Sequence, residues 1–389
     1  MKDEREYGLV LAGGGTKGAY QVGMWKALKE LNINIKAIVG ASIGSLNGAL
    51  ILQDNFKQME ELYNNIKITD IMDVGDEIDI EKNIFNVSNI TKMAVDFTEQ
   101  KGISNEPLRK TINKYIDMDK LYNSEIDFGL MTVKAKDLSP VPLFKNEIKK
   151  EEMTDYLLAS SCFPIFKPQK IGNEEYLDGG LYDNIPINML LEKGYKNIIV
   201  GDIAGVGLKR KMIDKNVYLK VISPNESLGG TFEFNHERIK NNIKLGYLDT
   251  MRAFNKLQGH IYYFKTSEFN KMLEQFNLQT IYGLEYSAKI YNIDRYREYE
   301  FEEFIKILNE KHKEAEKKYD KIKNSLHLKN LLELKNEINS IFDKGLGICF
   351  VTDMYLNKPM SKKFEYLKRF IQDYMQAMRS LLELENYME

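Results

Sequence analysis

Apolar and polar residues alternate in blocks along the first 60 residues, and each block predicts one element. Residues 7–12 form an apolar run typical of a buried strand, and residues 37–41 form a second one. Apolar side chains recur at spacings of three over residues 18–31, which predicts a helix, and another helix is expected from Ile43. This order of strand, helix, strand and helix predicts a parallel sheet with helices on its faces.

The same alternation continues to about residue 257. Further strands are expected at residues 128–135, 141–145, 174–177, 197–203 and 218–223, and further helices at 107–116, 153–159, 186–193 and 235–257. Residues 67–104 are polar with an acidic stretch, and we expect an insertion that caps the site. The pattern therefore predicts an α/β domain over residues 1–265, with this possible cap at 67–104 inside it.

Residues 266–389 have a different character and predict a mainly helical region of unknown role. A heptad-like stripe recurs there at spacings of three and four, at Phe364, Leu367, Ile371, Tyr374, Met378 and Leu381. The plain interpretation is a helix packed on its own domain; the alternative is a stripe that faces a partner or a membrane. Residues 345–349 form an apolar break, which we expect to be a strand that returns to the core.

Composition and charge narrow the class of protein. The 389 residues carry 55 basic and 57 acidic side chains, so the chain lacks the positive excess of a dedicated nucleic-acid binder. Its two cysteines cannot form a disulfide framework, and a reducing compartment is expected. No apolar stretch is long enough for a transmembrane helix, and the charged N-terminus lacks a signal-peptide core. We therefore expect a cytoplasmic protein whose contact with membranes, if any, is peripheral.

A G-x-S-x-G string, Gly40-Ala41-Ser42-Ile43-Gly44, lies between a predicted strand and a predicted helix. Glycines on both sides permit a turn too sharp for side chains, which exposes the serine hydroxyl in a strained conformation. The N-terminus of the following helix favours negative charge at that oxygen. The pattern thus indicates that Ser42 is a nucleophile.

A glycine-rich loop, Gly13-Gly14-Gly15-Thr16-Lys17-Gly18, connects the first strand to the first helix. Consecutive glycines can direct several backbone N–H groups toward one point, where they bind an oxyanion or a phosphate. The P-loop pattern fails, because Gly18 is not followed by Lys and Ser or Thr. A dinucleotide loop and a simple tight turn remain alternatives at this point.

A nucleophilic serine needs a base, and the four histidines do not offer a good one. His236, His260, His312 and His327 all lie late in the chain, in segments that predict surface or packing roles. Asp178-Gly179-Gly180 ends a predicted strand at the same edge of the sheet as the other two motifs. A carboxylate there can take the serine proton if a partly dry site tunes its pKa. The alternative for this string alone is an ordinary Asp-Gly turn.

Together these three motifs resemble the patatin-like phospholipase family over about residues 6–255. Asn184-Ile185-Pro186 and the string Ala159-Ser160-Ser161-Cys162-Phe163-Pro164 strengthen the resemblance by their order and spacing. It implies a three-layer α/β/α patatin-like core with a mainly parallel sheet, followed by the helical C-terminal region. It also implies a Ser–Asp dyad that hydrolyses lipid acyl esters through an acyl-serine intermediate.

The resemblance assigns a role to each matching residue. Ser42 matches the nucleophile, Asp178 the general base, and Gly13, Gly14 and Gly15 the oxyanion hole, with Thr16, Lys17 and Gly18 in the same loop. Gly40 and Gly44 match the nucleophile elbow, and Gly179 and Gly180 the aspartate loop. Lys17 departs from the family's usual Arg and cannot make its planar bidentate contacts.

The resemblance leaves the substrate and the partners to be chosen. A phospholipid or lysophospholipid ester is expected, reached by peripheral membrane contact, with no metal, no other cofactor and no nucleic acid. One alternative is a hydrolase of neutral lipids or other carboxylic esters. Another is a protein that binds a membrane or a protein partner through its C-terminal helices, which gate hydrolysis.

Overall fold

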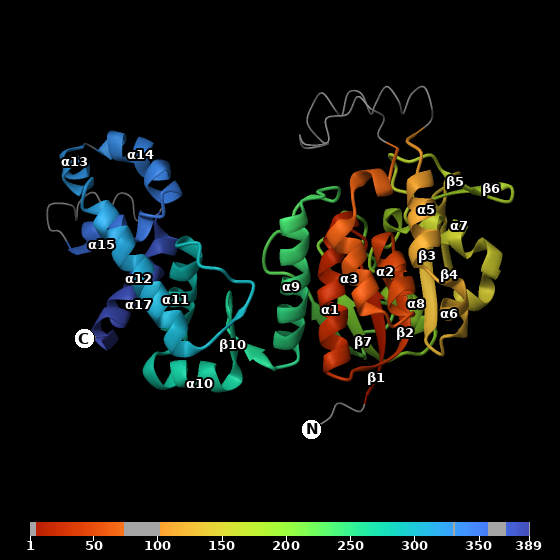
Figure 1. Ribbon diagram of the computed structural model, residues 1–389, viewed down its shortest axis with the longest axis horizontal. Helices are drawn as coiled ribbons and strands as arrows, with labels where there is room; N and C mark the ends of the chain where they lie inside the picture. The colour runs from red at the N-terminus through yellow and green to blue at the C-terminus, as the bar shows by residue number, and fades with distance from the viewer. Residues whose placement is uncertain (1–4, 74–101, 330, 357–370, 389) are drawn as a thin grey trace. The chain divides into compact units, whose positions relative to one another are not determined.

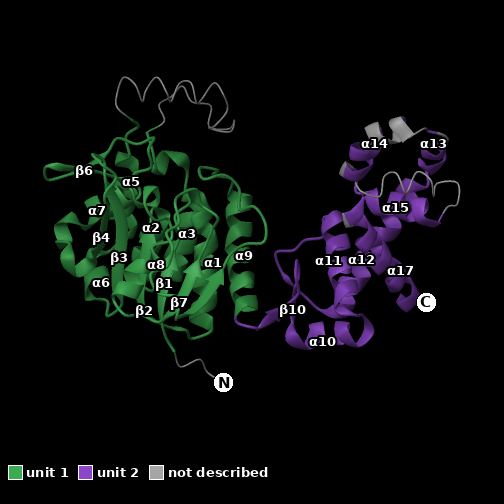
Figure 2. Cartoon of the chain, turned by 180° about the vertical axis from the view of Figure 1, so that it is seen from behind, with its two compact units in different colours: residues 1–253 green, residues 254–389 purple. Residues whose placement is uncertain are grey.

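The computed structural model describes residues 5–73, 102–329, 331–356 and 371–388 (Figure 1). It divides into two compact units, residues 1–253 and 254–389 (Figure 2). The sequence predicts this division at residue 265. Most of the expected cap, residues 67–104, lies outside the described residues.

The first unit is built on an eight-stranded sheet with the order β5-β6-β3-β2-β1-β7-β8, and β4 pairs with β3 beside this path. The strands are β1 (Glu6–Leu11), β2 (Asn34–Ala41), β3 (Asp127–Lys134), β4 (Pro140–Phe144), β5 (Gln169–Ile171), β6 (Glu174–Asp178), β7 (Asn197–Gly201) and β8 (Tyr218–Ile222). From β3 to β8 all pairings along the order are parallel, whereas β4, β5 and β6 run antiparallel to their neighbours. The mainly parallel sheet is therefore confirmed.

Helices cover both faces of this sheet, as Figure 1 shows. They are α1 (Ala19–Glu30), α2 (Ile43–Ile51), α3 (Phe56–Asn65), α5 (Glu106–Tyr115), α6 (Met118–Asn123), α7 (Met153–Ser160), α8 (Ile187–Glu192) and α9 (His236–Ala253). Gly8 of β1 lies against Leu190 of α8, and Gly201 of β7 lies against Met24 of α1. Gly201 pairs with Leu11, which lies three residues after Gly8 in β1. Because successive residues of a strand face opposite sides of the sheet, Gly8 and Gly201 face opposite sides, and so do the helices packed on them. The predicted three-layer α/β/α architecture is thus confirmed.

Helices α1 and α9 lie unusually close to each other because glycines face the contact. A Cβ at Gly23 would lie 1.7 Å from the Ile243 carbonyl oxygen, and one at Gly246 would lie 1.9 Å from that of Tyr20. Both helices therefore need glycine at these positions. The close packing fixes α9, which follows directly after the loops that border the candidate site.

The second unit is mainly helical, as the sequence predicts. Its helices are α10 (Thr266–Gln275), α11 (Leu278–Ile290), α12 (Phe301–Tyr319), α13 (Lys323–Leu328), α14 (Leu331–Asp343), α15 (Gly347–Leu356) and α17 (Gln372–Met388), with a small sheet of β9 (Leu257–Gln258), β10 (Tyr263–Lys265) and β11 (Glu298–Tyr299). Tyr262, Phe264 and Phe304 are fully buried at its centre. This aromatic cluster gives residues 254–389 a hydrophobic core of their own.

The structure contradicts one expectation for this unit and supports another. The expected strand at residues 345–349 is wrong, because helix α15 begins at Gly347; the short apolar run matched both types of element. In the heptad-like stripe, Phe364 and Leu367 lie outside the described residues. Ile371, Met378 and Leu381 are buried in the unit's own core, which supports the plain interpretation over a partner-facing one.

Candidate active site

Ser42 occupies the sharp turn between β2 and α2. Its backbone has φ 53° and ψ −130°, a region that a residue with a side chain rarely adopts, so the turn is strained. A Cβ on Gly40 would lie 2.3 Å from the Gly44 carbonyl carbon, and one on Gly44 would lie 2.1 Å from the Leu11 carbonyl oxygen. Only glycine fits at either position. The chain therefore folds here into the strand–turn–helix context that the G-x-S-x-G string requires.

A second serine, Ser160, for which the sequence predicts no role, holds this turn in place. The Ser42 N–H donates to the carbonyl oxygen of Ser160 at 3.1 Å and lies 3.2 Å from the Ser160 hydroxyl oxygen. That hydroxyl donates to the Met131 carbonyl oxygen of β3 at 2.8 Å. Ser160 thereby ties the elbow to the neighbouring strand, and its place in the string Ala159 to Pro164 was the available signal.

Asp178 is the last residue of β6 and is only 4% exposed. Its Oδ1 accepts the Gly180 N–H at 2.7 Å, which fixes the direction of the carboxylate. A Cβ on Gly179 would lie 2.1 Å from the Met131 carbonyl oxygen, so this loop also needs glycine. The other carboxylate oxygen, Oδ2, has no hydrogen-bond partner among the described residues.

Burial raises the pKa of Asp178 to about 6. The Ser42 hydroxyl and the Gly180 N–H favour the charged form and lower this pKa in part. A carboxylate with such a pKa is ionised at neutral pH and still basic enough to accept a proton. A buried, unsatisfied carboxylate oxygen beside a strained serine is the electrostatic signature expected of a functional site.

The glycine loop lies against the serine. Gly13 is so close that a Cβ there would come within 2.9 Å of the Ser42 Cβ, and Gly15 has φ 61°, with its Cα facing the Thr231 carbonyl oxygen. The Gly13 N–H donates to the Asn184 carbonyl oxygen at 3.3 Å, and the Thr16 N–H donates to the Thr231 carbonyl oxygen at 2.9 Å. For the N–H groups of Gly14 and Gly15, the described part of the chain provides no acceptor.

The remaining residues of the loop anchor it elsewhere. The Thr16 hydroxyl donates to the Gly230 carbonyl oxygen at 3.0 Å, and the Lys17 Nζ donates to the Ala204 carbonyl oxygen at 3.1 Å. The Gly18 carbonyl oxygen accepts from the Asn47 side chain at 3.1 Å. Lys17 and Gly18 do not line the cavity described next, whereas Thr16 does.

A cavity of about 250 Å³ joins these motifs. Ser42, Asp178, Gly180 and the turn Gly14–Thr16 contribute to its wall, and apolar side chains form most of the rest, including Leu46, Leu50, Leu62, Leu108, Ile112 and Phe166. A concave apolar space with a few convergent polar groups is the usual form of a small-molecule site. None of the four histidines lines it.

The sheet, the elbow and the glycine loop together define an α/β protein with a serine-centred candidate site. Residues 9–191 match the family model described as Patatin-like phospholipase. The chain therefore carries a patatin-like phospholipase domain, and the resemblance found in the sequence is confirmed over these residues.

Two relatives and one solved structure are also similar to this chain. Lysophospholipase NTE1 of Cryptococcus neoformans is 28% identical over 209 residues, which cover 52% of this chain and 11% of that protein. Lysophospholipase NTE1 of Saccharomyces cerevisiae is 24% identical over 301 residues, which cover 71% of this chain and 16% of that protein. The crystal structure of VipD from Legionella pneumophila aligns with 97% of this chain and 90% of its own, at 15% identity and a TM-score of 0.43. The chain thus spans a small part of the length of these two curated relatives.

Proposed function

We propose that this chain is a serine hydrolase of lipid acyl esters, with phospholipids or lysophospholipids as substrates. The observation that carries the proposal is that Ser42, Asp178 and the turn at Gly14 and Gly15 line one apolar cavity within a patatin-like phospholipase domain. The lysophospholipase names of the two relatives favour the same substrate class.

In the proposed first half-reaction, the Ser42 Oγ attacks the ester carbonyl carbon while Asp178 Oδ2 accepts the hydroxyl proton. The carbonyl π electrons move to the oxygen, and this oxyanion is held by backbone N–H groups of the glycine loop. We assign that role to Gly14 and Gly15, since Gly13 and Thr16 already donate to carbonyl oxygens. The tetrahedral intermediate then collapses, and the leaving alcohol takes the proton from Asp178.

The second half-reaction repeats these steps with water. Asp178 accepts a proton from a water molecule, and the oxygen of that water attacks the carbonyl carbon of the acyl-serine. The ester bond to Ser42 breaks, the fatty acid leaves, and Asp178 returns the proton to the Ser42 oxygen. Apart from water, no step requires a group other than residues that line the cavity, and none uses a histidine.

The apolar wall supports a fatty-acyl chain as the group that enters the cavity. Its side chains come from α2, α3 and α5 and surround Ser42 with hydrocarbon, which stabilises an acyl chain by removing it from water. A phospholipid substrate lies in a bilayer, so peripheral membrane contact is part of this proposal. None of the described helices combines the length and apolarity needed to cross a bilayer. A neutral-lipid hydrolase remains the second candidate, because its acyl chain would meet the same wall.

A lipid panel read by mass spectrometry tests the proposal. Incubation with phosphatidylcholine, lysophosphatidylcholine and a triacylglycerol is expected to release fatty acid from the phospholipids, with the triacylglycerol turned over at least about tenfold more slowly. Ser42→Ala protein is the control for contaminating lipases. Release from the triacylglycerol alone would favour the second candidate, and release from none of the esters would contradict both.

A further inference from the structure

The loop between β7 and β8, residues 202–217, presents apolar side chains to solvent. Val206, Leu208 and Ile213 are 74%, 56% and 62% exposed, which makes them the most exposed large hydrophobic residues in the described part of the first unit. Exposed apolar groups that cluster on one loop mark an interaction site more often than isolated ones do. We call residues 202–217 the mouth loop.

The backbone of the mouth loop is held by hydrogen bonds to neighbouring segments, so the exposure of these side chains is not due to an unsupported backbone. The Leu208 N–H donates to the Gly180 carbonyl oxygen at 2.9 Å, and the Asn184 N–H donates to the Leu208 carbonyl oxygen at 2.6 Å. Farther along, the Ile213 N–H donates to Asn188 Oδ1 at 3.0 Å. The mouth loop is thus pinned to the aspartate loop, and its apolar side chains are held outward.

The mouth loop borders the cavity itself. Val206 and Gly207 line the same space as Ser42 and Asp178. A lipid that moves from a bilayer to Ser42 along this border would keep its acyl chain in contact with apolar groups. Continuity between an exposed apolar loop and an apolar cavity is what a substrate delivered from a membrane requires.

Cationic side chains accompany the apolar ones. The mouth loop contains four basic residues, Lys209, Arg210, Lys211 and Lys215, all exposed, and two acidic residues, Asp202 and Asp214. Asp202 pairs with Lys209 at 2.7 Å, and Asp214 pairs with Lys196 outside the loop at 2.5 Å. The loop therefore has a local positive excess, whereas the whole chain has a net charge of −2.

We propose that the mouth loop docks the chain on an anionic lipid surface, with Leu208 and Ile213 inserted at the headgroup boundary. Apolar insertion and cationic attraction act together at membrane interfaces, which explains why the two kinds of side chain share one loop. The proposal deepens the proposed function, on which it rests, because it says how the cavity reaches a substrate that lies in a membrane.

Vesicle flotation tests this docking independently of hydrolysis. The full chain is used in the Ser42→Ala background, with vesicles of phosphatidylcholine alone or of equal parts phosphatidylcholine and phosphatidylglycerol. We expect the chain to float with the anionic vesicles, and Leu208→Asp/Ile213→Asp to weaken binding by about tenfold or more. Leu138→Asp is the matched control, since Leu138 is 46% exposed in the turn after β3 and does not line the cavity. That control is expected to bind like its parent.

Three results would separate the possible failures. Unchanged flotation of the double variant, or an equal loss in Leu138→Asp, would overturn the docking assignment. In the Ser42 background, the double variant should hydrolyse a water-soluble short-chain ester within about twofold of the parent, because neither side chain lines the cavity. If the Ser42→Ala chain floats but the chain that keeps Ser42 releases no fatty acid from any lipid, the docking stands and the proposed hydrolase function fails.

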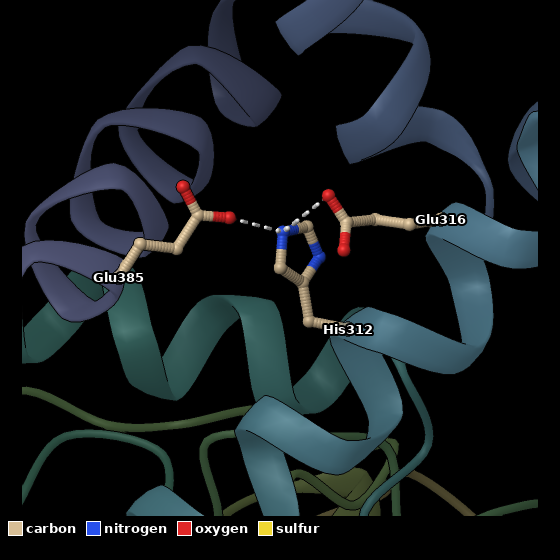
Figure 3. Close-up of side chains that lie close together, drawn as sticks. All are labelled: His312, Glu316 and Glu385. Atoms are coloured by element: carbon tan, nitrogen blue, oxygen red, sulfur yellow. Dashed lines mark ion pairs between the residues drawn. The ribbon is translucent and has the colours of Figure 1, made fainter. Parts of the chain in front are cut away.

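A separate observation in the second unit points to a metal site. His312 and Glu316 lie one turn apart on α12, and Glu385 of α17 faces them (Figure 3). His312 Nε2 lies 3.5 Å from Glu385 Oε1 and 3.9 Å from Glu316 Oε1, and the ligand atoms of all three residues lie within 4.8 Å of one another. Atoms bound tetrahedrally at roughly 2.0–2.2 Å from a zinc ion are about 3.3–3.6 Å apart. The separation between His312 and Glu385 falls in this range, and the wider separations would have to shorten when an ion binds.

The surroundings of His312 favour a metal over an ion pair. His312 is only 5% exposed, and a metal ligand must present the neutral ring with its lone pair. The Tyr291 hydroxyl oxygen lies 2.7 Å from Nδ1 and can accept a hydrogen bond from the N–H of that nitrogen. The Nε2 lone pair then points toward the two carboxylates, the arrangement that outer partners of ligating histidines usually impose.

We infer that His312, Glu316 and Glu385 bind one divalent transition-metal ion, with zinc as the best match to this ligand set, and that the ion joins α12 to α17. The carboxylate side chains are about half exposed, so they can close on the ion by small rotations and leave one position to water. No sequence motif indicates this cluster, because Glu385 lies more than 70 residues after His312.

Calorimetric titration of the full chain with Zn²⁺ tests this site, together with the visible absorption of a Co²⁺ complex. We expect one bound ion per chain, and at least about tenfold weaker binding in Glu385→Gln, with loss of the Co²⁺ bands. Glu310→Gln is the matched control, because Glu310 is exposed on α12 outside the cluster. Absence of binding at micromolar Zn²⁺, or equal binding by Glu385→Gln and its parent, would overturn the assignment.

Discussion

Replacement of Ser42 by alanine is expected to reduce fatty-acid release by roughly 10⁴-fold or more, the loss typical of a missing covalent nucleophile. The fold should survive, because alanine keeps the Cβ and the backbone N–H that bonds to Ser160. Alanine removes only the Oγ, which is the atom proposed to attack the ester. The measurement is mass-spectrometric release of fatty acid from the lipid panel, with thermal unfolding as the check on folding.

Ser161→Ala provides a matched control for this prediction. Ser161 lines the same cavity, and its buried hydroxyl has no hydrogen-bond partner among the described residues. Its loss is therefore expected to change turnover by less than about tenfold. A fluorophosphonate probe should label the wild-type chain at Ser42 and leave Ser42→Ala unlabelled. Labelling at Ser161 would contradict Ser42 as the nucleophile and assign that role to Ser161. A severe loss of turnover in Ser161→Ala, with Ser42→Ala still active, would have the same meaning.

The sheet and its elbow were predictable from sequence because their signals are local. Apolar runs such as residues 7–12 predict strands wherever they are short and followed by glycine, and the G-x-S-x-G string needs only its own strand and helix. The error at residues 345–349 has the same origin. An apolar run of that length fits a strand or a buried helix, and the choice for α15 depends on packing against Phe342 and Tyr374, which periodicity does not show.

The finer features of the site depend on contacts between distant segments. The N–H groups of Gly14 and Gly15 are available, whereas the N–H groups of Gly13 and Thr16 donate to the carbonyl oxygens of Asn184 and Thr231. These two partners lie more than 160 residues away in the sequence. The anchoring of Lys17 at Ala204 has the same character. A motif therefore indicates which loop belongs to the site, whereas tertiary contacts determine which of its N–H groups remain available.

Asp178→Asn is expected to lower fatty-acid release by about 10²–10⁴-fold, the usual contribution of a general base. Asparagine keeps an oxygen for the Gly180 N–H, so the loop should hold its position. The variant loses only the ability to accept a proton at Oδ2. Replacement of His236, which lies in the same unit but does not line the cavity, serves as the control and should leave turnover nearly unchanged.

The pH dependence of the wild-type chain tests the same role. Because burial raises the pKa of Asp178 to about 6, the base is ionised above that pH and protonated below it. The kcat/KM for a soluble ester is therefore expected to be level above about pH 7 and to fall about tenfold per pH unit well below pH 6. A level profile from pH 5 to 8 would contradict Asp178 as the base.

The Asp178→Asn variant is expected to be more stable than the wild-type chain, although it is less active. The folded-state pKa of Asp178 is raised above the value of about 3.9 for an unfolded chain, so the folded protein holds this proton more tightly. The ionised carboxylate therefore destabilises the fold above pH 6, and this cost disappears as the pH falls below about 4. Asp178→Asn removes it, and the free energy of unfolding at pH 7.5 is expected to rise by up to about 3 kcal/mol, with little change at pH 4. Chemical denaturation at both pH values measures this difference. A loss of stability at pH 7.5 would show instead that the carboxylate supports the fold, and the loss of activity in the variant would then say nothing about a base.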